Sequence, residues 1–153
     1  MRIGLGFDVH RFGGPGPLVL AGVQIDGPAL HGHSDADAVA HAVADALLGA
    51  AGLPDLGTIF PASDERYRGA SSIALLADVV TRVRAEGWQA GNVDVVIAAE
   101  EPRLGPYVGS MAAALTAVLG GPTSVKAKRG EGLGAIGRAE GIAVWAVALL
   151  EPL

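Results

Sequence analysis

Four histidines lie within the first 41 residues, at positions 10, 31, 33 and 41, and several carboxylates are close to them in the sequence. Asp8 and His10 are two residues apart on a predicted strand, so their side chains leave one face while Val9 points the other way, into the core. A carboxylate and an imidazole on one face can share a divalent metal such as zinc, which takes O and N ligands at about 2.0–2.2 Å. The pair alone also fits a second interpretation, in which Asp8 and His10 are only the polar end of a strand and bind no metal.

His41 lies in the middle of a predicted helix, with Asp37 and Asp45 four residues to either side on the same face. One interpretation is a solvated face that carries two weak ion pairs. In the other, His41 is a third metal ligand and Asp45 orients its ring. A fourth metal position then stays open, as in catalytic zinc sites.

A second polar group, from His31 to Asp35, comes before this helix. His31, His33 and Asp35 are spaced i, i+2, i+4, which in an extended segment is a rival set of metal ligands. His33 and Ser34 stand where free N–H groups and the positive end of a helix dipole favour an anion such as phosphate. Alternatively, Ser34 only caps the helix, and the two roles are compatible.

The dense basic cluster of the chain is Lys126, Lys128 and Arg129, followed by Gly130, Glu131 and Gly132. Lys126 and Lys128 share one face of a predicted strand, which is also typical of a solvated sheet edge. The glycines and Glu131 favour a phosphate and metal site, in which Glu131 binds Mg²⁺ and backbone N–H groups bind phosphate. No GxGxxG, Walker A, GxSxG or HExxH motif is present.

The composition limits the class of protein. A length of 153 residues predicts a single domain, residues 1–153. The net charge of −5 and the pI near 5.2 argue against a nucleic-acid or membrane-surface binder. Half the residues are hydrophobic and the mean hydropathy is +0.41, an excess that could cover a subunit interface. The absence of cysteine excludes disulfides and thiolate metal sites.

Two further features concern location. Asp8 interrupts the apolar stretch that a signal peptide would need, so we predict no export and a cytoplasmic protein. The longest apolar run, Ile142 to Leu150, is far shorter than the ~20 residues of a spanning helix and is expected to be a buried strand.

The pattern of apolar residues and turns predicts an α+β fold. We expect two layers, with helices on one face of a mixed four-stranded sheet, plus a short hairpin. The uncovered face of such a sheet commonly packs against another subunit. A loop over 54–71 is a lid candidate. The predicted strands are 2–12, 18–20, 23–25, 92–99, 123–129 and 138–150, and the predicted helices are 36–50, capped by Ser34 and Asp35, one that follows residue 71 and ends at Gly87, and 107–119.

Four segments in this order span nearly the whole chain: RIGLGFDVHRFG, HGHSDADAVAHAVADALLGAAGLPDLGTIFP, GNVDVVIAAEEPRLGP and GEGLGAIGRAEGIAVWAVALL. Together they resemble the 2-C-methyl-D-erythritol 2,4-cyclodiphosphate synthase family of the non-mevalonate isoprenoid pathway. The resemblance implies metal-assisted intramolecular phosphoryl transfer in 4-diphosphocytidyl-2-C-methyl-D-erythritol 2-phosphate, with release of CMP. It also implies Zn²⁺ together with Mg²⁺ or Mn²⁺, and a homotrimer in which the sheets meet and the active sites lie between subunits.

The same resemblance assigns residues. It implies zinc ligands at Asp8, His10 and His41, which demotes the rival set, and a second metal at Glu131. His33 and Arg129 fall on positions that assist the reaction. The substrate-binding positions are Asp8, Val9, His10, His33, Ser34, Asp55, Leu56, Gly57, Phe60, Asp64, Ala99, Pro102, Arg103, Leu104, Gly105, Lys128, Arg129, Glu131, Ala135 and Arg138.

Arg138 and Glu140 are two residues apart and are expected to share a face of the last predicted strand. The resemblance places Arg138 near the threefold axis, where three guanidinium groups would suit an isoprenoid diphosphate in a central cavity. The alternative is a surface ion pair of little energetic weight.

Two positions depart from the family's pattern. Ala62 replaces an acidic residue that would accept hydrogen bonds from the polyol, and Arg129 replaces a threonine. Two other functions therefore stay open: a non-catalytic trimer of the same fold that binds a metal or an isoprenoid diphosphate, and a metal-dependent phosphohydrolase.

Overall fold

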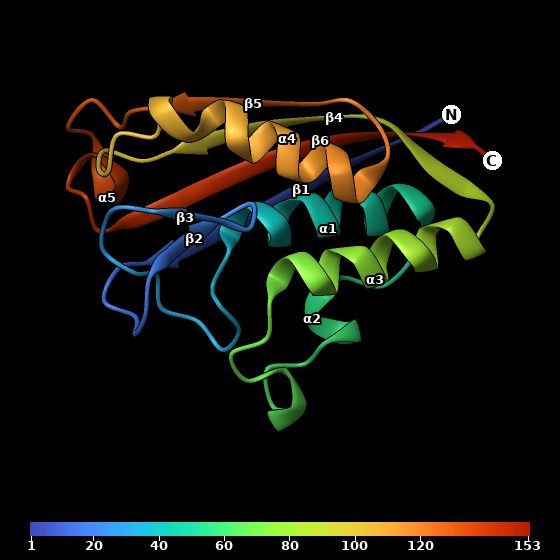
Figure 1. Ribbon diagram of the computed structural model, residues 1–153, viewed down its shortest axis with the longest axis horizontal. Coiled ribbons are helices and arrows are strands. Elements are labelled where there is room, and N and C mark those ends of the chain that lie inside the picture. The colour runs from blue at the N-terminus through green and yellow to red at the C-terminus, as the bar shows by residue number, and fades with distance from the viewer.

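The computed structural model describes residues 1–153 and contains one mixed four-stranded sheet and a separate hairpin (Figure 1). The sheet order is β1 (Arg2–Arg11), β6 (Gly141–Pro152), β4 (Trp88–Ala98) and β5 (Thr123–Lys128). β4 and β5 run parallel and the other neighbours antiparallel, so the sheet is mixed as predicted. The hairpin consists of β2 (Leu18–Leu20) and β3 (Val23–Ile25).

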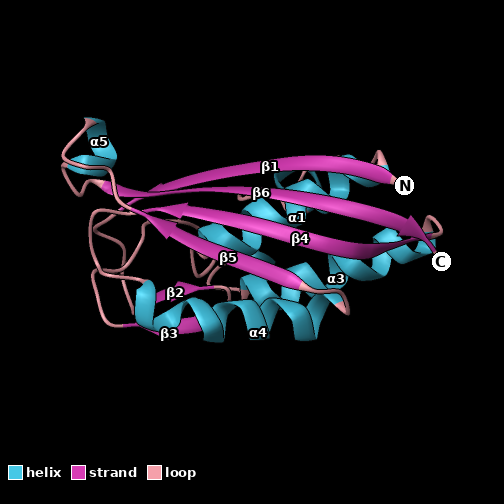
Figure 2. Ribbon diagram, turned by 90° about the horizontal axis from the view of Figure 1, so that it is seen from above, coloured by secondary structure: helices cyan, strands magenta, loops and turns pink.

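Three long helices cover one face of the sheet, which confirms the two-layer prediction (Figure 2). They are α1 (Ala38–Ala51), α3 (Ser72–Ala85) and α4 (Val108–Leu119). α1 packs directly on β1 and β6. Gly4 and Gly6 of β1 permit this close packing, because a Cβ at either position would collide with the backbone of α1 at Ala46 or Ala42.

The other face of β1 and β6 is apolar and uncovered in the single chain. Ile3 and Leu5 are 73% and 67% exposed, and Phe7, Val9, Trp145 and Val147 are exposed beside them. Phe7 and Trp145 are opposite each other in the β1–β6 register, with ring centroids 5.2 Å apart. The prediction that Val9 points into the core is therefore wrong: the face of β1 that meets α1 carries glycines and then Asp8 and His10.

Helix α1 begins at Ala38, two residues later than predicted, and its cap is Asp37 rather than Ser34 or Asp35. Asp37 is fully buried, and its carboxylate accepts hydrogen bonds from the N–H groups of Val39 and Ala40 at 3.1 and 3.0 Å. The same carboxylate binds both N–H groups of the turn between β2 and β3, at 2.8 and 2.7 Å. This contact to the hairpin explains why Asp37 is the cap.

The remaining differences are in the connections. The segment 54–71 contains α2 (Leu56–Ile59) and a 3-10 helix (Glu65–Tyr67), where an irregular loop was predicted. β4 starts four residues earlier than predicted, with an irregular register beside Gly91. A short helix, α5 (Gly134–Gly137), precedes β6, which starts only at Gly141. No helix is both long and apolar enough to cross a membrane.

A candidate metal centre and two pockets

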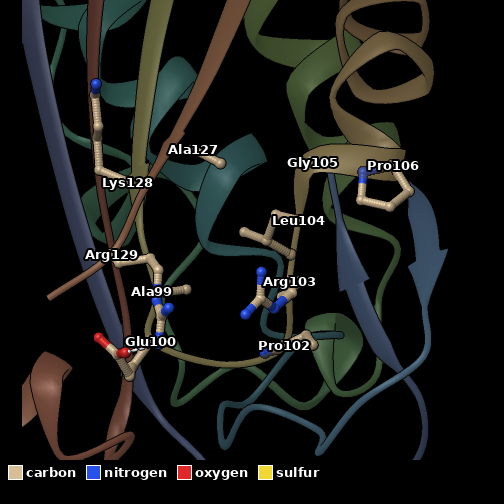
Figure 3. Close-up of a pocket in the computed structure, with 10 residues that line it drawn as sticks. All are labelled: Ala99, Glu100, Pro102, Arg103, Leu104, Gly105, Pro106, Ala127, Lys128 and Arg129. Carbon is tan, nitrogen blue, oxygen red and sulfur yellow. Dashed lines mark hydrogen bonds and ion pairs between the residues drawn. The ribbon is translucent and has the colours of Figure 1, made fainter. Parts of the chain in front are cut away.

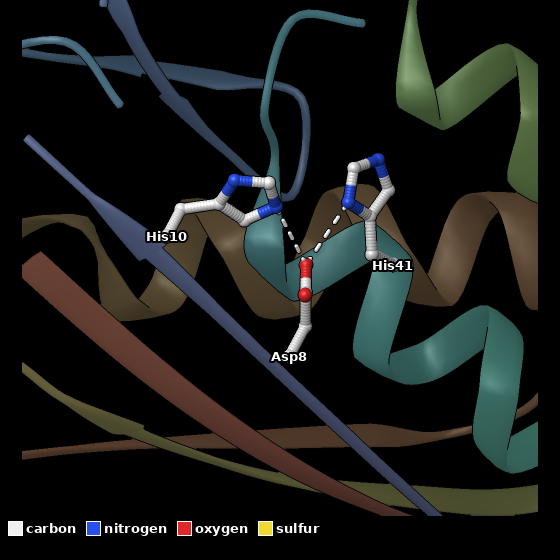
Figure 4. A group of neighbouring side chains, drawn as sticks. All are labelled: Asp8, His10 and His41. Atoms are coloured by element: carbon white, nitrogen blue, oxygen red, sulfur yellow. Dashed lines mark hydrogen bonds and ion pairs between the residues drawn. The ribbon is translucent and has the colours of Figure 1, made fainter. Parts of the chain in front are cut away.

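Asp8 and His10 of β1 meet His41 of α1 (Figure 4). Asp8 Oδ2 lies 2.9 Å from His10 Nε2 and 3.0 Å from His41 Nδ1. One ligand atom from each residue lies within 4.8 Å of the others, so one carboxylate oxygen and two ring nitrogens surround a common point. This is a donor set that zinc and similar divalent metals accept, with room for a further ligand. The three predicted zinc ligands therefore come together.

The outer nitrogen of each imidazole has its own partner. His10 Nδ1 donates to the carbonyl oxygen of His31 at 2.8 Å, which leaves Nε2 as the ligand atom. His41 Nε2 lies 2.8 Å from the hydroxyl of Ser72. Backing of this kind fixes the orientation of metal-binding histidines.

The contacts in this site shift the pKa values of Asp8 and His10. Burial would raise the pKa of Asp8, but hydrogen bonds from His10 and His41 outweigh it and hold the pKa far below its usual range. The hydrogen bond to Asp8 raises the pKa of His10 above its usual value, although burial opposes the shift. Without a metal, the site is therefore a carboxylate that binds imidazole N–H groups.

Two expectations about this site need correction. Asp45 does not orient His41: its carboxylate accepts the N–H of Leu56 at 2.8 Å, and Ser72 holds the outer nitrogen of His41 instead. Burial raises the pKa of Asp45. The rival set of His31, His33 and Asp35 does not come together either, since His31 contributes its carbonyl group to His10 and Asp35 binds Ser72.

A cavity of about 250 Å³ opens beside the metal ligands. His33 and Ser34 line it, and His33 Nε2 is buried with no hydrogen-bond partner in the protein. An unpartnered buried nitrogen is costly, so this atom is available to a ligand. The other lining residues are Leu56, Gly57, Phe60, Ala62, Tyr67 and Leu75, of which Tyr67 and Leu75 were not predicted.

Two predicted substrate-binding residues, Asp55 and Asp64, form hydrogen bonds with other residues of the chain. Asp55 caps α2 by accepting the N–H of Thr58 at 2.9 Å. Asp64 binds the Arg66 guanidinium, with Nη2 to Oδ2 at 2.6 Å. These hydrogen bonds lower the pKa of both carboxyl groups.

A second cavity of about 330 Å³ lies between the paired ends of β4 and β5 on one side and the segment 102–106 on the other (Figure 3). Its lining includes the predicted residues Ala99, Pro102, Arg103, Leu104, Gly105, Lys128 and Arg129, together with Glu100, Pro106 and Ala127. Glu100 was missed: it pairs with Arg129, and its Oε2 accepts the N–H of Gly130 at 3.0 Å. Glu100 and Arg129 meet because the parallel register aligns Ala98 with Lys128, and no local pattern in the sequence indicates this alignment.

The remaining predicted residues lie outside both cavities. Glu131 is exposed with a φ of 52°, and Ala135 belongs to α5. Arg138 and Glu140 precede β6, so the prediction that they share a strand face is wrong, although Arg138 Nε still donates to Glu140 Oε1 at 2.6 Å. No residue lines both cavities.

The chain is an α+β domain with an O, N, N donor set that could hold a metal ion, an unpartnered histidine beside this set, and a second cavity lined by three cations. These features define a class of protein suited to a phosphorylated small molecule. The comparisons agree with this class. The model of the YgbB family matches residues 1–151, and the chain belongs to this family.

Similar proteins fall into two groups by length. The bifunctional enzyme IspD/IspF of Anaeromyxobacter sp. is 51% identical over 153 residues, which cover 98% of this chain and 40% of that protein. The 2-C-methyl-D-erythritol 2,4-cyclodiphosphate synthase of Bordetella petrii is 50% identical, with 97% and 94% covered. The chain thus spans about 40% of the bifunctional relative and nearly all of the shorter one. The IspF–CDP complex of Plasmodium falciparum superposes with a TM-score of 0.85 at 32% identity, covering 99% and 96%.

Proposed function

We propose that this chain converts 4-diphosphocytidyl-2-C-methyl-D-erythritol 2-phosphate into 2-C-methyl-D-erythritol 2,4-cyclodiphosphate and releases CMP, as a phosphorus-oxygen lyase of the non-mevalonate isoprenoid pathway. The observation that carries the proposal is the single cavity that holds the Asp8, His10 and His41 ligand set together with His33 and Ser34. Relatives about 50% identical to the chain bear the name of this synthase.

In the proposed reaction, an oxygen of the 2-phosphate attacks the β-phosphorus of the diphosphate. The bond from that phosphorus to the CMP oxygen breaks, CMP leaves with the electron pair, and the cyclic diphosphate closes. The attacking phosphate is already ionised at neutral pH and CMP is a stable anion, so little acid–base catalysis is needed. The obstacle is to hold two anions together and in line, which positioning and positive charge overcome.

The residues of the first cavity would bind the reacting groups. Zn²⁺ held by Asp8, His10 and His41 would supply positive charge and orient a phosphate. His33 Nε2 is placed to bind a phosphate oxygen, and Ser34 Oγ lies beside it in the same cavity. Apolar residues such as Leu56 and Phe60, which line this cavity, would cover the methylerythritol and exclude water.

The second cavity would bind the cytidine diphosphate end. Backbone groups from Ala99 to Gly105 would bind the base, while Arg103, Lys128 and Arg129 provide cations for phosphates. The similar IspF structure from Plasmodium falciparum is a complex with CDP, which supports a cytidine-linked substrate. Arg129 would supply a positive charge at the position where the family's pattern has a threonine hydroxyl group. Glu131 would hold Mg²⁺ or Mn²⁺ at the diphosphate.

The two cavities share no residue, yet the substrate must occupy both kinds of site. A homotrimer would solve this by completing each active site with the second cavity of a neighbouring subunit. The exposed apolar face of β1 and β6 is the surface that would meet in the trimer.

Incubation with the cytidyl substrate and a divalent metal, followed by phosphorus NMR, tests this function. We expect the cyclic diphosphate and CMP in equal amounts, with no inorganic phosphate. Release of inorganic phosphate would indicate a phosphohydrolase instead. Unchanged substrate, in a protein that retains its metal, would indicate the non-catalytic trimer.

We also propose that Arg138 binds an isoprenoid diphosphate at the trimer axis. Its guanidinium is exposed, and its partner in the chain is the equally exposed Glu140. Geranyl or farnesyl diphosphate is expected to raise the melting temperature of the parent and to have less effect on Arg138→Ala. Equal thermal shifts in the two proteins would leave Arg138 as part of a structural ion pair.

A further inference from the structure

Ser72 is the first residue of α3 and is only 1% exposed. Apart from Asp37, it is the only polar or charged residue in the buried set. Its hydroxyl lies 2.8 Å from His41 Nε2 and is also hydrogen-bonded to Asp35 Oδ1. Its burial excludes a role as a nucleophile, so the hydroxyl must act through the groups that it contacts.

The hydrogen-bond pattern gives this contact a direction. Asp35 accepts both donors of Ser72: the hydroxyl on Oδ1, and the backbone N–H on Oδ2 at 3.0 Å. Since the single hydroxyl hydrogen is directed to the carboxylate, Ser72 Oγ can only accept from His41. When the neutral ring binds a metal, it must therefore carry its hydrogen on Nε2 and use the lone pair of Nδ1 as the ligand; this is the nitrogen that lies 3.0 Å from Asp8 Oδ2. His10 reaches the same arrangement through the carbonyl of His31.

We propose that Ser72 and Asp35 are positioning residues that keep His41 in its metal-binding tautomer. The inference rests on the proposed metal centre and adds two residues that act on it without touching the metal. The neighbouring Ser34 hydroxyl does not replace Ser72, because it lies 3.2 Å from His41 Nε2 and accepts the N–H of Ala36.

The same residues connect the metal centre to the segment 54–71. Ser72 directly follows this segment, and the N–H of Asp35 donates to the carbonyl of Ala70 at 3.1 Å. Gly69 N–H donates in turn to the carbonyl of His33 at 2.9 Å. The wall of the first cavity and the orientation of His41 are therefore fixed by one set of hydrogen bonds.

Zinc dissociation constants, measured by competition with a chromophoric chelator, test the proposal. We expect Ser72→Ala to bind zinc roughly tenfold or more weakly than the parent, the size of effect seen when the group behind a ligating histidine is removed. Asp35→Ala should also bind more weakly, because the freed hydroxyl can turn and donate to His41. Asp35→Ala should add little in the Ser72→Ala background, because Asp35 acts through Ser72. Ser71→Ala is the matched control: it removes the neighbouring hydroxyl, which only caps α3.

An affinity of Ser72→Ala within about twofold of the parent, or single effects that multiply in the double variant, overturns the proposal. Histidine ¹H–¹⁵N NMR of the zinc-loaded parent decides it without any variant: a hydrogen on His41 Nε2 is expected, and its absence contradicts the direction of the hydrogen bonds. A parent that binds no zinc would instead refute the metal centre, so the two failures are distinguishable.

Discussion

At the scale of single residues, Asp8 determines what the site can do. One of its oxygens contacts both His10 and His41, so a proton on either ring and a metal ion compete for the same place. Each ring is held from behind, by a backbone carbonyl in one case and by Ser72 in the other. The ligand atoms are thus positioned before a metal arrives, which lowers the entropic cost of binding it.

Replacing His41 with alanine should remove most of the zinc. The substitution deletes one of three protein ligands, and the two that remain cannot complete the site. The zinc content, measured by elemental analysis after gel filtration, is expected to fall from one equivalent per chain in the parent to a small fraction of an equivalent in the variant. His31→Ala is the matched control, because its exposed ring has no ligand role and its carbonyl is retained. A full equivalent in His41→Ala would show that the metal binds elsewhere.

The pH dependence of the metal-free protein follows from His10, whose folded pKa is raised above 6.5. A raised pKa stabilises the fold fully below the unfolded value and loses this contribution as the pH rises through the folded value. The difference in free energy of unfolding between the parent and His10→Gln should therefore shrink from pH 5.5 to 8.5. With saturating zinc, this difference should instead grow as the pH rises over the same range, because zinc binds only neutral His10. Chemical denaturation measures both, and a pH-independent difference would contradict the assignment.

At the scale of elements, the site depends on how closely α1 approaches β1. Gly4 and Gly6 leave no side chain between the strand and the helix, and α1 presents alanines in return. Two residues further along β1, on the same face, Asp8 meets His41 at 3.0 Å. The glycines of β1 therefore set the distance between the two elements that carry the candidate metal ligands.

Adding a methyl group at Gly6 should destabilise the protein. A Cβ there would collide with the backbone of α1 at Ala42 and Ala46, so the helix must move away, at a cost of roughly 1–3 kcal/mol or more. Gly49→Ala makes the same change on the exposed side of α1, where a Cβ meets nothing within 4 Å, and should stabilise by about 0.5–1 kcal/mol. Thermal unfolding of both variants decides the point, and a Gly6→Ala variant as stable as the parent would contradict it.

Local patterns predicted those parts of the fold that local forces determine. The spacing of Asp8 and His10 on a strand correctly placed both side chains on one face, and turn residues located most helices and strands. The start of α1 was misplaced because Asp37 is selected by its contact with the hairpin, which is distant in sequence. Ser72 was missed for the same reason: it is 31 residues from His41, and only the packing of α3 on α1 brings them together.

At the scale of the whole molecule, a single chain is incomplete in two respects. One face of its sheet exposes a continuous set of large apolar side chains, which soluble monomers rarely do. The two cavities also lie on the chain without sharing a residue. Both features have one explanation if the apolar faces of several copies pack together, because the first cavity of one subunit can then lie beside the second cavity of its neighbour.

Sedimentation should accordingly show a particle of three times 15.3 kDa at micromolar concentration. Leu5→Glu places a charge in the middle of the apolar face. Because Leu5 is 67% exposed in the single chain, the monomer fold should tolerate the change, whereas a buried charge would break the interface. We expect folded monomers that bind zinc at Asp8, His10 and His41 but release no CMP, since each active site would lack its second cavity.

Ala77→Glu adds the same charge on the exposed surface of α3 and should remain trimeric and active. A parent that sediments as a stable monomer, or a Leu5→Glu monomer that retains full activity, would show that one chain forms the whole site alone.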